Sequence, residues 1–255
     1  MIDAHCHLEQ KDFEKDLPKV LEDARKLGIK AFISCCANPK DLKRALEIAK
    51  TEKDVFLTLS FHPIHVAEFP KNEIEKYMEK IKELAKEDEK VVGIGETGLD
   101  YFWVKDEKMR ELQKEIFVKH LEIAENLDMP VVIHSREAHE DTIKILEEFK
   151  PKKLLWHFFG VKYYLEELIS KKWFGSFNTL IFRSKTHKKI VKKMPLENFM
   201  LETDSPWLGF GKRNDPRAII KVAEKVAEVK KLPFQEVWQA AGNNAKSLFS
   251  LEIDI

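Results

Sequence analysis

The sequence has little cysteine and no excess of charge of either sign. Its 255 residues include three cysteines, Cys6, Cys35 and Cys36, which lie in apolar segments and form no Cys-x-x-Cys pair. This usage is typical of buried, reduced thiols and does not indicate a disulfide framework. Lysine plus arginine and aspartate plus glutamate both number 44, so the formal net charge is zero. A polyanionic partner would therefore have to bind at a local patch.

Long apolar runs and flexible linkers are absent as well. The chain has no apolar run long enough to cross a bilayer, and its N-terminus lacks a basic segment followed by an apolar one. We therefore expect a cytoplasmic protein that uses no membrane, and no obligate protein partner is evident. No low-complexity or Pro/Gly/Ser-rich linker divides the sequence, which predicts one domain over residues 1–255.

What the sequence does contain is an alternation of short apolar runs with longer, charged segments of helical period. The clearest helix is predicted at residues 107–127, where apolar residues recur at helical spacing. Eight apolar runs are predicted as strands covered by helices on both faces, at residues 2–8, 31–36, 55–61, 91–96, 130–135, 154–159, 173–178 and 199–204. Because no Gly-x-Gly-x-x-Gly motif is present, this pattern favours an α/β fold of the closed (β/α)8 TIM barrel type over an open sheet.

The first predicted strand carries two histidines separated by one residue. Side chains on a strand alternate between its faces, so His5 and His7 point the same way, together with Asp3. Two imidazoles placed in this way can bind one metal ion. A coincidental pair of histidines on a terminal strand is the alternative, and the residues on the other strands decide between the two.

Polar residues end most of the other predicted strands, and they include histidines and carboxylates. In a barrel the carboxyl ends of all strands open at one rim, so residues distant in sequence converge there. Nitrogen and oxygen ligands without a cysteine pair fit one or two divalent ions such as Zn, Mn, Co or Mg. Six ligands exceed a single tetrahedral site, whereas two ions with a shared carboxylate would activate a water between them. The polar residues that end these strands are His62, Glu96, His134, His157, Asn178 and Asp204, in addition to His5 and His7 on the first strand.

Several short motifs, spread over most of the chain, occur in an order and spacing that are highly specific together. They are Asp3-Ala4-His5-Cys6-His7, Phe61-His62-Pro63, Gly95-Glu96-Thr97-Gly98-Leu99-Asp100-Tyr101, His134-Ser135-Arg136, Leu201-Glu202-Thr203-Asp204-Ser205-Pro206, Asn214-Asp215-Pro216 and Asn243-Asn244-Ala245. With these motifs the sequence resembles the TatD-type metal-dependent deoxyribonucleases of the amidohydrolase superfamily. It departs from their pattern at Ser60, where glycine is usual, and in the short segments after His157 and Asp204.

The resemblance implies a site with two divalent metal ions, Mg, Mn or Zn. Glu96 would bridge the two ions and serve as a catalytic residue with Asp204, which would orient and deprotonate the attacking water. One ion would be held by His5, His7, Glu96 and Asp204, and the other by Glu96, His134 and His157.

The resemblance also implies how a substrate phosphate is bound. His62 and Arg136 would contact it, although a rim salt bridge to Asp100 or Glu137 is the alternative for Arg136. We expect Asp100 to orient a ligand imidazole without touching the metal. Arg183 and Lys185, in the basic cluster after the seventh predicted strand, are candidates for contact with DNA.

The function expected from these residues is a metal-dependent deoxyribonuclease that hydrolyses phosphodiester bonds at DNA ends. Single-stranded or frayed 3′ ends are the expected substrate. Aromatic residues after the fourth and eighth strands could stack on bases or pack on their own protein; they are Tyr101, Phe102, Trp103, Trp207 and Phe210. The alternatives are a small-molecule hydrolase of the superfamily, acting on a lactone, amide or phosphotriester, and a non-catalytic metal-binding scaffold.

Overall fold

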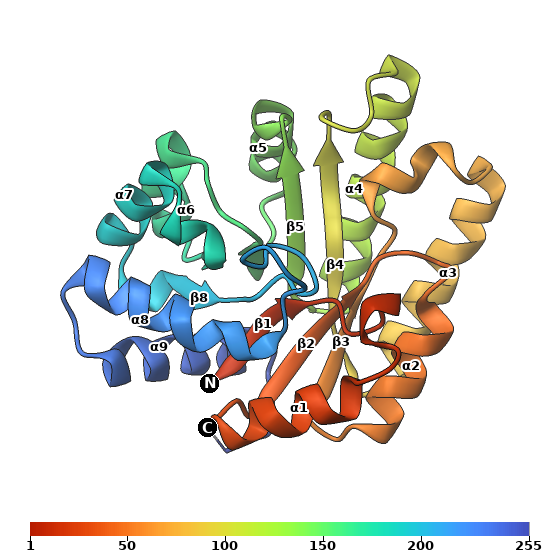
Figure 1. Cartoon of the computed structure of the whole chain (residues 1–255). Coiled ribbons are helices and arrows are strands. Elements are labelled where there is room, and N and C mark those ends of the chain that lie inside the picture. The colour runs from red at the N-terminus through yellow and green to blue at the C-terminus, as the bar shows by residue number, and fades with distance from the viewer. Residues whose placement is uncertain (255) are drawn as a thin grey trace.

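Parallel strands form the centre of the structure, a computed structural model that describes residues 1–254 (Figure 1). Each strand pairs in parallel with the next one along the chain, in the order β1 to β8. This is the predicted (β/α)8 barrel, which is confirmed. The strands are β1 (Ile2–Cys6), β2 (Ala31–Cys36), β3 (Val55–Leu59), β4 (Val91–Asp100), β5 (Val131–Arg136), β6 (Leu154–Trp156), β7 (Phe174–Phe177) and β8 (Phe199–Leu201).

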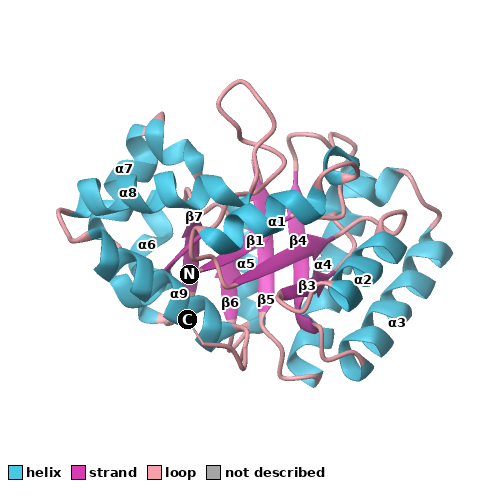
Figure 2. Cartoon of the chain, turned by 60° about the horizontal axis from the view of Figure 1, so that its bottom comes forward, coloured by secondary structure: helices cyan, strands magenta, loops and turns pink. Residues whose placement is uncertain are grey.

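Helices surround the strands on the outside of the barrel (Figure 2). The helix predicted at residues 107–127 is α4. Asp106 caps its N-terminus, since the side chain of Asp106 accepts a hydrogen bond from the backbone N–H of Met109. The α-helices are α1 (Leu17–Lys26), α2 (Leu42–Thr51), α3 (Lys71–Glu87), α4 (Glu107–Asn126), α5 (His139–Phe149), α6 (Leu165–Ser170), α7 (Lys185–Lys193), α8 (Ile219–Lys230) and α9 (Phe234–Leu248). Short 3-10 helices are η1 (Lys11–Phe13), η2 (Pro63–Ala67), η3 (Lys162–Tyr164), η4 (Thr179–Phe182), η5 (Leu196–Asn198) and η6 (Pro216–Ala218).

The two ends of the sheet are joined by the segment that follows β8. The backbone N–H of Asp204 donates to the carbonyl of His5 (3.0 Å), and that of His7 donates to the carbonyl of Ser205 (2.8 Å). Asp3 accepts hydrogen bonds from the backbone N–H and the hydroxyl of Thr203, at 2.9 and 2.6 Å. Asp3 therefore closes the barrel, whereas the histidines after it face the barrel mouth. Figure 1 shows α9, at the blue end of the chain, beside β1 and β8.

Most strands end one or more residues away from the end that the sequence pattern predicts, and β4, β6 and β8 differ most. The fourth strand was expected to end at Glu96, but β4 continues to Asp100. It can do so because Gly98, at φ +137°, lets β4 approach β5 so closely that a Cβ there would clash with the carbonyl oxygen of His134. β6 and β8 are shorter than expected, since their last predicted residues lie in the loops beyond them. No helix within residues 1–254 is both long and apolar enough to span a membrane.

Candidate metal centre

Glu96 lies at a β-bulge, and the bulge directs its side chain into the mouth of the barrel. The pairing of β4 with β5 shifts between Gly95 and Thr97, so Glu96 is the extra residue of β4. An extra residue of this kind changes the direction in which a side chain points. The hydroxyl of Ser60, which replaces the usual glycine, donates to the Glu96 carbonyl at 2.6 Å. The result is a buried carboxylate, 4% exposed, held between β3 and β5.

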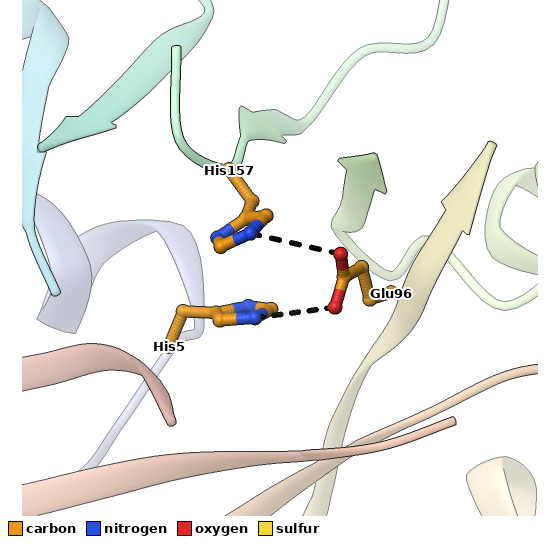
Figure 3. A group of neighbouring side chains, drawn as sticks. All are labelled: His5, Glu96 and His157. Atoms are coloured by element: carbon orange, nitrogen blue, oxygen red, sulfur yellow. Dashed lines mark ion pairs between the residues drawn. The ribbon is translucent and has the colours of Figure 1, made fainter. Parts of the chain in front are cut away.

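The two oxygens of the Glu96 carboxylate face different imidazoles. Oε2 lies 3.3 Å from Nε2 of His5 and 3.6 Å from Nε2 of His7. Oε1 lies 2.8 Å from Nδ1 of His134 and 3.6 Å from Nε2 of His157. Figure 3 shows His5 and His157 on the same side of Glu96, each toward its own carboxylate oxygen, and their rings stack at 3.7 Å.

Asp204 joins the imidazoles that face Oε2. Its Oδ1 lies 3.5 Å from Nε2 of His7 and 3.7 Å from Nε2 of His5. The residue adopts a left-handed backbone conformation (φ 53°), which turns its carboxylate back toward β1 just after the chain leaves β8. We call His5, His7 and Asp204 the Oε2 group.

His62 lies among the imidazoles on the other side of the carboxylate. Its Nε2 is 3.4 Å from Oε1 of Glu96, and its ring lies 4.7 Å from that of His134. Its Nδ1 accepts a hydrogen bond from the backbone N–H of Ile64 at 3.3 Å. We call His62, His134 and His157 the Oε1 group, and we call both groups together with Glu96 the Glu96 centre.

The donors of the Glu96 centre converge closely enough to hold divalent ions. Three sets of ligand atoms each lie within 4.8 Å of one another: His5, Glu96 and His157; His5, His7 and Asp204; and His62, Glu96 and His134. All donors are imidazole nitrogens or carboxylate oxygens, which suit Zn, Mn or Mg. The structure thus brings together every ligand that the sequence predicts, in an arrangement that fits a metal centre.

Two imidazoles of the Oε1 group contact a second carboxylate through the ring nitrogen that does not face Glu96. Nδ1 of His157 lies 3.0 Å from Oε2 of Glu202. The other oxygen of Glu202, Oε1, accepts a 2.8 Å hydrogen bond from the amide of Asn178. Nε2 of His134 lies 3.0 Å from Oδ2 of Asp100. Such partners fix the orientation of a metal-binding imidazole and increase its basicity. Asp100 lies where the sequence analysis expects it to orient a ligand.

The imidazoles of the Oε2 group have different partners behind them. Nδ1 of His7 lies 3.5 Å from Oε1 of Glu9, which is buried. Nδ1 of His5 lies 3.0 Å from the thiol sulfur of Cys35, and this sulfur accepts a hydrogen bond from the hydroxyl of Thr58 at 2.8 Å. His5 is therefore the one member of its group backed by a thiol.

The sequence analysis did not identify Glu9, Glu202 or Cys35 as partners of the ligands. A signal for two of them was present, since Glu9 follows His7 by two residues and Glu202 precedes Asp204 by two. Residues two apart share a face on a strand, so carboxylates at these positions can lie near the same site. For Cys35 only its place on the second strand was informative, because any small residue would fill that position.

The protonation of the imidazoles follows their partners. Burial lowers the pKa of His157, but Glu202 and Glu96 together raise it to about 9. The pKa of His134 is raised in the same way, against burial, by hydrogen bonds to Asp100 and Glu96. Burial and the neighbouring His157 lower the pKa of His5, and burial lowers that of His62 to about 4. Burial would lower the pKa of His7, but its contacts with Asp204 and Glu9 raise it well above its ordinary value. At neutral pH the metal-free centre therefore favours protons on His7, His134 and His157.

Arg136 packs against two aromatic side chains that follow β4. The sequence predicts contact of Arg136 with a substrate phosphate, and a salt bridge to Asp100 or Glu137 was the alternative. Among residues 1–254, Glu137 pairs with Lys105 and Asp100 with His134, and neither pairs with Arg136. In the structure Arg136 is exposed, and its guanidinium carbon lies 3.9 Å from the ring centre of Phe102 and 5.6 Å from that of Trp103. The planar guanidinium packs on an aromatic face, because this contact leaves its outer N–H groups open to water.

Arg183 and Lys185 lie outside the Glu96 centre. Arg183 follows η4, Lys185 begins α7, and both side chains are exposed. Among residues 1–254 neither forms an ion pair with a carboxylate. They remain candidates for contact with a polyanion on the strength of their charge and position after β7.

Comparison with known proteins agrees with this arrangement. The family model described as TatD related DNase matches residues 2–250. The uncharacterized metal-dependent hydrolase YabD of Bacillus subtilis is 32% identical, over 98% of this chain and 99% of its own. The human protein named deoxyribonuclease TATDN3 is also 32% identical, over 98% of this chain and 94% of its own. The crystal structure of YJJV, a TatD homolog from Escherichia coli, superposes with a TM-score of 0.89 at 26% identity, covering 98% of both chains.

Proposed function

This chain belongs to the family of TatD-related DNases and is a metal-dependent hydrolase, and we propose that its reaction is the hydrolysis of phosphodiester bonds at DNA ends. Removal of nucleotides from single-stranded or frayed 3′ ends is the form of this reaction that we favour. DNA is proposed as the substrate because relatives such as the human protein are named deoxyribonucleases.

One observation carries the proposal: the two oxygens of Glu96 face two separate groups of ligands. A carboxylate in this position can bridge two ions, with His5, His7 and Asp204 around one and His134 and His157 around the other. Divalent ions held there would lower the pKa of a water and stabilise charge on the attacking and leaving oxygens of the phosphodiester. We propose two ions, and Mg, Mn and Zn all suit the ligands.

Asp204 is the residue that we propose as the base. Its Oδ1 lies within 3.5 and 3.7 Å of the imidazoles of the Oε2 group, so a water near that group is within reach of the carboxylate. The carboxylate would accept a proton from this water as its oxygen attacks phosphorus. Glu96 would keep the ligands of both groups in place around the reacting atoms.

The proposed phosphate contacts are His62 and Arg136. His62 lies inside the centre, and because its Nδ1 accepts a hydrogen bond from Ile64, its Nε2 carries the hydrogen of the neutral ring and can donate it to a phosphate oxygen. Arg136 lies at the rim and would meet a phosphate further along the strand, with the aromatic ring of Phe102 holding its guanidinium plane. Arg183 and Lys185 would add attraction for the DNA backbone that weakens with salt.

The test is cleavage of a labelled single-stranded oligonucleotide by protein stripped of metal and then supplied separately with Mg, Mn or Zn. Asp204→Asn should reduce the rate by about 10²- to 10⁴-fold, the usual contribution of a general base. Glu122→Gln, at an exposed position on α4, is the matched carboxylate control and should cleave as the wild type does. If no metal restores cleavage although metal analysis shows the centre filled, the nuclease proposal fails, and lactones and phosphotriesters become the substrates to screen.

A further inference from the structure

Exposed aromatic side chains gather at the end of the barrel that carries the Glu96 centre. Among residues 1–254, five large apolar side chains are strongly exposed. Trp103 follows β4, Tyr163 follows β6, and Trp207 and Phe210 follow β8, so four of the five lie beyond the carboxyl ends of strands. Only Leu27 follows a helix. Apolar surface concentrated in this way indicates a binding surface more than scattered exposure does.

Trp207 is the exposed aromatic residue that reaches the metal ligands. Its ring lies 4.5 Å from that of His7, at an interplanar angle of 66°, and 48% of the residue is still exposed. The side of the indole that does not meet His7 is therefore available to a ligand. A group resting on that side would be separated from His7 by the indole ring alone.

The loop that carries Trp207 is held in place at both ends. The backbone N–H of Trp207 donates to the carbonyl of Asp204 at 2.9 Å, and that of Asn214 donates to the carbonyl of Pro206 at 2.9 Å. Arg213 forms two hydrogen bonds of 2.8 and 2.7 Å with the carboxylate of Asp16. A ring that is already positioned loses little conformational freedom when a ligand binds to it.

We propose that Trp207 is the stacking platform for the base next to the scissile phosphate, which restricts the substrate to strands with an unstacked base. This inference rests on the proposed function and names the substrate class more closely. Every base has a flat aromatic face, so an exposed indole can accept any of the four. Within a duplex both faces of a base are covered by its neighbours, and only a single-stranded or frayed end can present one to Trp207. The neighbouring Phe210, 46% exposed and 5.2 Å from the ring of Phe182, extends the same apolar surface.

Two single-stranded oligonucleotides that differ only at the cleaved nucleotide test the proposal. One carries a base there and the other an abasic tetrahydrofuran residue. For the wild type the KM should be about tenfold higher on the abasic substrate, since base stacking on an aromatic residue contributes an effect of this order. In Trp207→Ala the two KM values should become equal. Trp207→Phe keeps an aromatic face and should restore part of the difference.

The control separates stacking from support of the metal ligand. If Trp207 only holds His7 in place, Trp207→Ala will slow both substrates equally and leave their KM ratio unchanged, which would overturn the proposal. An equal KM for both substrates in the wild type would overturn it as well. Tyr163→Ala, at a residue 69% exposed, should leave the KM ratio at the wild-type value. If the wild type cleaves neither oligonucleotide, the proposed function is contradicted, and with it the role proposed for Trp207.

Discussion

The two sides of the Glu96 carboxylate differ in the groups that lie behind their imidazoles. On the Oε1 side, Glu202 and Asp100 each lie 3.0 Å from the second ring nitrogen of a ligand, His157 and His134. On the Oε2 side, Glu9 lies 3.5 Å from His7, but His5 meets the neutral thiol of Cys35. The carboxylates raise the pKa of His157, His134 and His7, whereas burial lowers the pKa of His5. The three imidazoles with a carboxylate partner must therefore give up protons before they bind an ion, whereas His5, beside the thiol, is already neutral.

The largest effect should come from Glu96→Ala, which removes the residue common to both sides. The loss of activity should exceed the roughly 10- to 100-fold that follows the loss of a partner behind a ligand, because the bridging ligand itself is gone. Steady-state cleavage at saturating Mn measures it. Activity within threefold of the wild type would contradict the assignment of Glu96 as the bridge.

Glu202→Gln should weaken the Oε1 side by about 10- to 100-fold in metal affinity, since it removes the charge behind His157. The side chain is buried and also accepts hydrogen bonds from Ser176 and Asn178, so the amide must keep these contacts. Isothermal titration of the metal-free protein with Zn measures the affinity. Glu197→Gln, at an exposed position, is the matched control. Equal affinities in the two variants would show that the carboxylate behind His157 is unimportant.

The same comparison predicts how the stability of the metal-free protein depends on pH. The pKa of His157 is about 9 in the folded state, above its ordinary value near 6.5, although burial alone would lower it. The protonated imidazole therefore stabilises the fold fully below about pH 6.5, and this contribution is lost as the pH rises through 9. We expect the Tm of metal-free protein to fall by several degrees from pH 6.5 to 9.5. Glu202→Gln should flatten this slope, and an unchanged slope in that variant would count against the pair.

Cys35→Ser should have the smallest effect. A hydroxyl can take the place of the thiol beside Nδ1 of His5 and near Thr58, and neither group carries a charge there at neutral pH. Zn affinity should change by less than about threefold, below the range given for charged partners. A loss as large as that of Glu202→Gln would mean that the thiol binds as a charged group, and the two sides would then be alike.

Much of the barrel could be predicted from the sequence because strands buried on both faces leave a strong apolar pattern. The eight strands and α4 were located within a few residues of their observed positions. The end of β4 was predicted four residues too early, because the polar and glycine residues after Glu96 are typical of a loop. Their place in the sheet depends on the close approach of Gly98 to His134, a tertiary contact that no local pattern records.

That the side chains of the Glu96 centre lie together could be predicted from the sequence, because each lies at or near the carboxyl end of a predicted strand. Their partners could not be assigned in the same way. The contact of Cys35 with His5 joins β2 to β1, and that of Glu202 with His157 joins the end of β8 to the loop after β6. The contact of Arg136 with the Phe102 ring could not be predicted either, because strand alternation gives the side of the sheet but not the position of a ring in the following loop.

The central claim is that Glu96 joins two metal sites, and the metal content of the protein tests it most directly. Metal-stripped protein would be equilibrated with a small excess of Mn, dialysed, and analysed by mass spectrometry for Mn per chain. The account predicts two ions per chain in the wild type, one in His5→Ala and fewer than one in Glu96→Ala. A single ion in the wild type, or two ions retained in Glu96→Ala, would contradict it.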